Sequence, residues 1–186
     1  MRRMFIVVLA GMMLSCIPSA AQRFSVSTNL LGYACLGTLN ADVSLSVSQN
    51  WSLTAGVKYN PFTFGADDPE NQMQLRQRAF SFGARMWPWH NASGWWLAGK
   101  LRYQEYNLGG ILTRETEEGD KAGFGMYAGY TLMVSRHFNV EFGLGLWSGA
   151  AWYKKYSCQS CGLTIENGRK WFLHPDDLMI SLAYVF

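Results

Sequence analysis

The final stretch of the chain, residues 178–186, constrains the fold most strongly. Large apolar side chains occupy every second position from Leu178 to Phe186, and smaller side chains lie between them. A period of two predicts a β-strand with two different faces. A strand of this kind needs a neighbour along its open edge, and closure into a barrel supplies one. We therefore expect 178–186 to be the closing strand of a β-barrel, with Tyr184 and Phe186 as the signal for insertion into a bacterial outer membrane.

The first 21 residues are typical of a secretory signal. Basic residues precede an apolar stretch, 4–14, and small residues lead to a cleavage site between Ala21 and Gln22. The apolar stretch is too short for a membrane-spanning helix. Processing as a lipoprotein at Cys16 is the alternative. Cleavage after Ala21 would divide the chain into a signal peptide, 1–21, and a single domain, 22–186.

Alternation of large apolar residues with small or polar ones recurs along the rest of the chain. It predicts eight strands, near 24–30, 42–48, 51–60, 77–86, 95–104, 123–134, 138–147 and 178–186. Short turns are expected near 49, 90 and 136. Longer loops are expected at 65–75, 107–121 and 154–172, and a connection of intermediate length at 35–40. With both termini in the periplasm, every short connection falls inside and every longer one outside, as in outer-membrane barrels.

Composition decides between a membrane barrel and a soluble one. Charged residues make up 16% of the chain, against ~25% in soluble domains, and aromatic residues are abundant. The polar face of the strands is mostly Gly, Ser, Thr and Asn, which suits a crowded lumen better than a water-facing surface. A soluble barrel of lipocalin type is therefore the less favoured alternative. The net charge of +3 is spread along the chain and gives no case for nucleic-acid binding.

Aromatic residues near the strand ends suggest two girdles, as expected at the two membrane interfaces. The inner girdle would contain Trp51, Trp87, Trp95, Phe138 and Phe186. The outer girdle would contain Phe62, Phe64, Tyr106, Trp152 and Tyr153.

Several blocks of sequence resemble one family. They are Thr28-Asn29-Leu30-Leu31-Gly32-Tyr33, Tyr59-Asn60-Pro61-Phe62-Thr63-Phe64 and the closing Ser181-Leu182-Ala183-Tyr184-Val185-Phe186. They are similar to domain-of-unknown-function family 3575, small outer-membrane barrels of Bacteroides-type bacteria. The resemblance implies an exported, integral barrel without an assigned enzyme activity, and a possible surface or fimbrial protein as partner. The chain departs from the family in its fourth strand and around Leu173-His174-Pro175.

The predicted lumen collects six charged residues. They are Asp42, Lys58, Arg85, Lys100, Arg102 and Glu141. Buried charges are costly unless they are paired, so we expect an ion network that fills the barrel. Four bases face only two acids, which requires a further acceptor or water. A narrow solute channel through the same residues is the alternative.

Other reactive residues give weaker indications. Cys158 and Cys161 lie close together in an exported chain, which predicts a local disulfide and leaves Cys35 unpaired. Reduced thiols, or redox or metal chemistry, are the alternatives. His174 with Asp176 or Asp177, and a serine such as Ser157 or Ser160, could form the rim site of a lipid-modifying enzyme.

We therefore expect an all-β, eight-stranded antiparallel transmembrane β-barrel with a filled lumen, located in the bacterial outer membrane. Its partners would be the outer-membrane insertion machinery, outer-membrane lipid and lipopolysaccharide, and a surface protein bound by the outer loops. No enzyme activity, cofactor or metal is expected. The alternatives are the lipid-modifying enzyme near His174 and the narrow channel.

Overall fold

The computed structural model describes residues 24–65, 73–110, 115–157 and 163–186. The predicted signal peptide, with its Ala21–Gln22 cleavage site, and the pair Cys158 and Cys161 lie outside these ranges. The elements are β1 Phe24–Asn29, α2 Leu30–Ala34, β2 Leu39–Ser46, β3 Trp51–Asn60, β4 Thr63–Phe64, β5 Met73–Met86, β6 Gly94–Gly109, β7 Thr116–Met133, β8 Phe138–Tyr156 and β9 Thr164–Val185.

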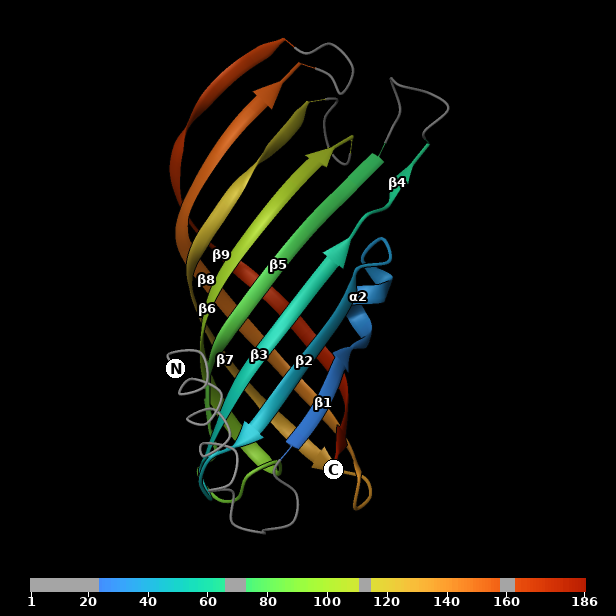
Figure 1. Cartoon of the computed structure of the whole chain (residues 1–186), viewed down its shortest axis with the longest axis vertical. Coiled ribbons are helices and arrows are strands. Elements are labelled where there is room, and N and C mark those ends of the chain that lie inside the picture. Colours follow the sequence, from blue (N-terminus) through green and yellow to red (C-terminus); the bar gives the residue numbers. More distant parts are fainter. Residues whose placement is uncertain (1–23, 66–72, 111–114, 158–162) are drawn as a thin grey trace, which may run out of the picture.

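The strands form one closed antiparallel barrel (Figure 1). Hydrogen bonding follows the order β3-β2-β1-β9-β8-β7-β6-β5-β4, and pairing of β3 with β5 closes the ring. The strand β4 continues β3 beyond Pro61, which has no N–H for the ladder. The barrel therefore has eight strands, as the sequence predicts. Its C-terminal strand β9 pairs with β1, so the expected closing role of 178–186 is confirmed.

The first connection differs from the prediction. The first strand ends at Asn29, and Leu30 already belongs to the helix α2. The Asn29 side chain accepts a hydrogen bond from the Leu31 N–H at 3.2 Å, which caps the helix start. The predicted continuation of the strand to residue 30 is therefore wrong, because a capping residue competes with strand alternation there.

The strands β5 to β9 extend well beyond β1, β2 and β3 (Figure 1). Much of the predicted loop at 107–121 is strand, since β6 runs to Gly109 and β7 begins at Thr116. Most of the predicted loop at 154–172 is strand too, because β8 runs to Tyr156 and β9 begins at Thr164. We call the part of these five strands at and above the upper end of β3, where Tyr59 pairs with Arg78, the outer extension (Figure 1). Residues there are polar on both faces of the strands. Apolar and polar residues therefore do not alternate along the sequence, even though the strands pair.

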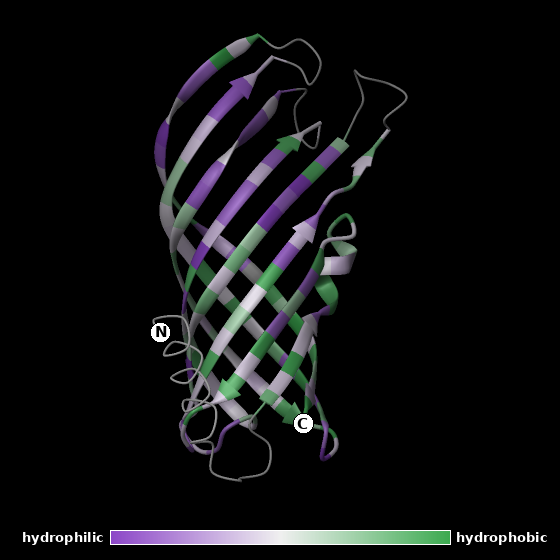
Figure 2. Ribbon diagram, viewed as in Figure 1, coloured by the Kyte–Doolittle hydropathy of each residue, from purple (hydrophilic) through white to green (hydrophobic). Residues whose placement is uncertain are grey.

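Below the outer extension, the outward side chains form an apolar band. These exposed residues include Trp51, Leu53, Val57, Phe80, Phe82, Trp95, Leu97, Leu101, Phe124, Met126, Leu132, Phe138, Phe142, Leu144, Leu178 and Leu182. Hydrophobic residues predominate in the lower half of the barrel and hydrophilic ones in the outer extension (Figure 2). From Trp51 to Tyr59, a rise of ~3.3 Å per residue at a tilt of ~40° gives a height of roughly 20 Å. That height is close to the ~25 Å band of outer-membrane barrels.

Two residues expected in the aromatic girdles point into the barrel instead. Trp87 and Tyr106 are almost fully buried. Each follows an outward-facing residue by one position, so strict alternation directs its side chain inward. Tyr153 is half-buried and approaches the inward-facing Lys170, so it also leaves the predicted outer girdle.

Glycines allow the wall to bend sharply where β7 and β8 pair. Gly123 lies opposite Gly149. A Cβ on Gly123 would lie 2.1 Å from the Ser148 carbonyl oxygen, and one on Gly149 would lie 2.1 Å from that of Ala122. Only residues without a side chain tolerate this approach, and such kinks provide the curvature that barrel closure requires.

Candidate functional site

The lower lumen is filled by an ion pair between aromatic rings. Arg85 of β5 donates from Nη1 to Glu141 Oε1 of β8 at 2.8 Å, and their side chains are 6% and 7% exposed. The guanidinium carbon of Arg85 lies 4.1 Å from the centre of the Trp96 ring and 5.3 Å from that of Trp87. Thr131 also donates to Glu141. The Arg85 charge is thus compensated by a carboxylate and stabilised by two ring faces.

A second ion pair lies in the middle of the lumen. Lys100 of β6 donates from Nζ to Asp42 Oδ1 of β2 at 2.9 Å. The same ammonium group lies 5.4 Å from the centre of the Tyr127 ring. Lys58 is close enough to Asp42 to interact electrostatically with it. The structure therefore brings these predicted lumen residues together from opposite walls of the barrel.

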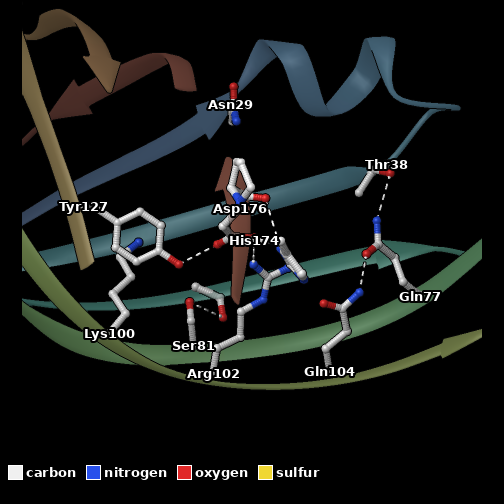
Figure 3. Close-up of polar contacts among 12 residues, drawn as sticks. Asn29, Thr38, Gln77, Ser81, Lys100, Arg102, Gln104, Tyr127, His174 and Asp176 are labelled. Atoms are coloured by element: carbon white, nitrogen blue, oxygen red, sulfur yellow. Dashed lines mark hydrogen bonds and ion pairs between the residues drawn. The ribbon is translucent and has the colours of Figure 1, made fainter. Parts of the chain in front are cut away.

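The third ion pair uses an acid that the predicted network did not include. Arg102 donates from Nη1 to Asp176, and the Tyr127 hydroxyl donates to the other oxygen of the same carboxylate (Figure 3). The guanidinium carbon of Arg102 lies 4.6 Å from the centre of the Trp147 ring. Asp176 also interacts electrostatically with Lys58. Asp176 thus supplies the further acceptor that four bases and two acids require.

A β-bulge directs Asp176 into the lumen. Leu144 pairs with Leu178, but Leu146 pairs with Pro175, so β9 has an extra residue at this point. Below the bulge the buried residues of β9 are odd-numbered, as at Met179 and Ser181. Above it, an even-numbered residue, Asp176, faces inward. The sequence signal was the break in alternation at Pro175, which also removes a ladder donor.

An upper cluster lies inside the outer extension. The Tyr106 hydroxyl donates to Glu117 Oε1 at 2.7 Å, and Lys170 Nζ lies 2.8 and 2.9 Å from the two Glu117 oxygens. Lys121 Nζ lies 4.2 Å from the centre of the Tyr106 ring. Burial raises the pKa of the Glu117 carboxyl, but the hydrogen bonds from Lys170 and Tyr106 outweigh it and hold the pKa below its ordinary value of 4.5. Burial lowers the pKa of Lys121, and Glu117 partly counteracts this.

The depressed pKa of Glu117 predicts a pH-dependent contribution to stability. A carboxyl whose pKa is lowered by folding stabilises the folded state above its unfolded pKa, and this contribution is lost as the pH falls through the folded value. Glu117→Gln should therefore lower the midpoint of urea unfolding in lipid vesicles at pH 7. The difference from the wild-type chain should shrink as the pH falls below 4.5, the ordinary pKa of the carboxyl, and vanish below its folded pKa. A difference that persists undiminished at pH 3 would contradict this role for the Glu117 charge.

The hollows in the lumen are small. One of about 10 Å³ lies beside Arg85, Trp87 and Glu141, and another of about 20 Å³ lies beside Lys100 and Arg102. A hollow of about 10–15 Å³ holds a single water molecule. Among the described residues, the side chains therefore leave no continuous opening through the lumen at these levels.

A larger hollow, of about 600 Å³, crosses the outer extension. Two rows of side chains line it: Tyr59, Arg78, Glu105, Asp120 and Trp152 in one, and Pro61, Arg76, Asn107, Glu118, Lys154 and Asn167 in the other. Both rows alternate in phase with the apolar band, so most of the lining belongs to the outward face. The other lining residues lie between these rows and belong to the inward phase: Asn60, Gln77, Tyr106, Gly119 and Tyr153. It contains bases and acids together, such as Arg78 and Glu105 at 3.9 Å. A surface of mixed charge like this suits polar partners.

His174 is placed away from the rim that the enzyme hypothesis requires. Its ring lies 5.6 Å from Trp147 and 5.0 Å from Phe172, centre to centre, and its Nδ1 is 3.0 Å from the Pro175 carbonyl oxygen. Trp147 pairs with His174. Ser157 follows the last residue of β8 and is ten residues beyond Trp147, which is ~30 Å at ~3.3 Å per residue. Asp176 is engaged by Arg102 and Tyr127. Ser160 lies outside the described residues, and the side chain of Asp177 is not described.

Neither a metal centre nor a spanning helix is found in the described residues. No three His, Cys, Asp or Glu side chains within these ranges are grouped so that they could hold a metal ion. No helix within them is long and apolar enough to cross a membrane. Cys35 is an exposed free thiol.

These features define a class of protein. It is a closed eight-stranded antiparallel β-barrel whose lumen is filled by ion pairs and aromatic rings, with a five-stranded extension at one end. The chain belongs to the DUF3575 family, described as proteins of unknown function, because the model of that family matches residues 4–186. No protein in the curated set matches the chain.

Proposed function

We propose that this protein is an integral outer-membrane β-barrel that acts as a fixed platform and presents its outer extension to a partner at the cell surface. The observation that carries the proposal is the change in polarity of the outward-facing side chains along the height of the barrel wall. An apolar band roughly 20 Å high is followed by the polar outer extension, with exposed charges such as Arg78 and Lys154. A surface that is apolar outside and polar inside is typical of a barrel in lipid.

The lumen supports a structural role over transport. Each of the ion pairs Arg85–Glu141, Lys100–Asp42 and Arg102–Asp176 joins opposite parts of the wall. Opening a path would require these buried pairs to separate, which leaves charges uncompensated. The channel and the lipid-modifying enzyme therefore receive less support than the platform, the latter because His174 packs among lumen aromatics.

The outer extension supports the partner-binding part of the proposal. It holds the hollow of about 600 Å³, which is within the size range of binding sites. Arg76 and Lys154 line this hollow and are exposed. Loops and strand ends held on a rigid barrel are common positions for recognition.

Amine-reactive cross-linking on intact cells tests this proposal. Lys154 is exposed on the outward face, so it should react and should give reproducible links to one surface protein, identified by mass spectrometry. Lys154→Arg keeps the charge but removes the reactive amine, so links that form through residue 154 should disappear in this control. If Lys121, Lys154, Lys155 and Lys170 react only after the cells are broken open, the surface location is wrong.

A further inference from the structure

The edge of β9 is only partly covered by its neighbour β1. The β1 strand pairs with β9 from Ser25↔Val185 to Asn29↔Ser181 and then ends. The Asn29 side chain extends the cover slightly, since its Oδ1 accepts from the Ile180 N–H at 3.2 Å and its Nδ2 donates to the Leu178 carbonyl at 3.3 Å. The helix α2, which follows β1, also contacts β9. Beyond Asn29, no strand among the described residues pairs with this edge of β9.

The backbone groups on this open edge belong to the outward-facing residues of β9. Side-chain direction and hydrogen-bonding direction alternate together along a strand. Leu178, an outward residue, directs its carbonyl toward the β1 side. The outward residues further up, Asn167, Arg169, Trp171 and Leu173, therefore direct their N–H and C=O groups toward the same side. Pro175 fits this pattern, because proline in a strand is tolerated where the missing N–H faces an open edge.

The side chains along the open edge are unusually apolar for this part of the barrel. Trp171 is 75% exposed and Leu173 is 71% exposed. Ile165 and Leu163 are 58% and 70% exposed. They lie further out than the row of paired residues that contains Arg169, Trp152 and Asp120. Trp171 and Leu173 share ladder rows with Phe80 and Phe82 of the apolar band. These rows rise from β5 toward β9 because the strands are tilted, so the β9 end of each row lies further out (Figure 1). Large exposed apolar side chains at that level mark a contact surface.

We infer that the open edge of β9, residues 167–173, binds an extended segment of a partner protein that adds a strand to the outer extension. The added strand continues the ladder that β1 begins and runs antiparallel to β9, the more stable arrangement. Its backbone pairs with four outward residues of β9. Its outward side chains are apolar opposite Trp171 and Leu173, and an acidic side chain opposite Arg169 completes the charge match. This inference rests on the proposed platform function and names the mode of binding.

A second copy of this chain does not fit the same edge. Two barrels inserted in the same sense present their β9 strands in the same direction. Antiparallel pairing of the two edges would require one barrel to be inverted in the membrane. The occupant is therefore a strand from a different protein.

Proline and alanine substitutions at Arg169 distinguish the contribution of its backbone N–H to partner binding from that of its side chain. Arg169→Pro removes the edge N–H and leaves pairing with β8 intact, because that residue directs its backbone away from β8. Gly168 before it accepts the restriction that proline imposes on its neighbour. Arg169→Ala removes the same side chain but keeps the N–H. Leu173→Pro and Leu173→Ala form a second matched pair if Arg169→Pro does not fold, as judged by the heat-dependent mobility of the folded band on gels.

The measurement is photo-cross-linking on intact cells, with the photoreactive amino acid at Asn167 in the full chain. We expect an adduct with one partner segment of alternating apolar pattern, retained in Arg169→Ala and reduced about tenfold in Arg169→Pro. Equal adducts in the two variants overturn the inference, as does an adduct that contains only this chain. If the photoreactive residue captures a partner at Lys154 but not at Asn167, the edge inference fails and the platform stands. If neither position captures a partner, the platform function fails as well.

Discussion

Replacing Glu141 with Gln should destabilise the folded barrel by about 3–5 kcal/mol, the cost of leaving one member of a buried ion pair without its partner. Arg85 has a side chain that is 6% exposed, so water cannot take over the role of the carboxylate. The rings of Trp96 and Trp87 remain in contact with the guanidinium group, but a cation–ring contact recovers only ~2 kcal/mol. The amide of Gln can still accept a hydrogen bond, yet it carries no compensating charge.

The measurement is the temperature at which the folded band is lost on gels, together with urea unfolding in lipid vesicles. Glu166→Gln is the matched control, because Glu166 is 51% exposed and lies 3.6 Å from Lys155. Exposed pairs contribute up to ~1 kcal/mol, so this control should change little. The double variant Arg85→Met with Glu141→Gln should recover part of the loss, since the uncompensated charge is then removed. An unchanged transition in Glu141→Gln alone would show that the pair does not stabilise the lumen.

Replacing Asp176 with Asn should destabilise the barrel by roughly 2–4 kcal/mol. The Asp176 carboxylate accepts from both Arg102 and Tyr127. An amide has only one acceptor oxygen, so one of these two donors loses its partner at Asp176, and the charge of Arg102 loses its main compensation. The effect should exceed that of Asp120→Asn, because the Tyr103 hydroxyl that donates to Asp120 belongs to an exposed residue.

Asp176→Asn is best followed by urea unfolding in lipid vesicles, with indole fluorescence as the probe. Trp147 lies over Arg102, so its environment reports on the same part of the lumen. We expect the midpoint to fall well below that of Asp120→Asn. Equal midpoints for the two variants would mean that the acid placed inward by the bulge is not part of the network that holds the wall together.

The strand order and the lower lumen could be predicted because one physical cause governs both. Where one face of a strand is outward and apolar and the other faces a crowded lumen, large apolar and small or polar side chains alternate. An isolated charged residue such as Arg85 or Glu141 is then easy to recognise among the small residues of the lumen face. The inward positions of Trp87 and Tyr106 could have been predicted in the same way. Their positions in the alternation direct them inward, but their closeness to the turns suggested a girdle instead.

Other parts of the site left no such signal. The outer extension is polar on both faces, as around Glu105 and Asp120, so nothing in hydropathy separates strand from loop there. Asp176 enters the lumen through a bulge, and a bulge changes which positions face inward without changing composition. The open edge of β9 depends on where β1 stops, at Asn29, which is a property of the pairing register rather than of either segment alone.

Thiol labelling on intact cells tests the central claim, that the barrel spans the outer membrane with its outer extension outside. The background carries Ser in place of Cys16, Cys35, Cys158 and Cys161, and one cysteine is introduced at a time. Asn167 lies exposed on the extension, and Arg136 lies exposed in the turn at the opposite end. A membrane-impermeant maleimide should label Asn167→Cys on intact cells, and Arg136→Cys only after the outer membrane is permeabilised. Labelling of Arg136→Cys on intact cells while Asn167→Cys stays protected, or equal protection of both until the cells are lysed, would contradict the account.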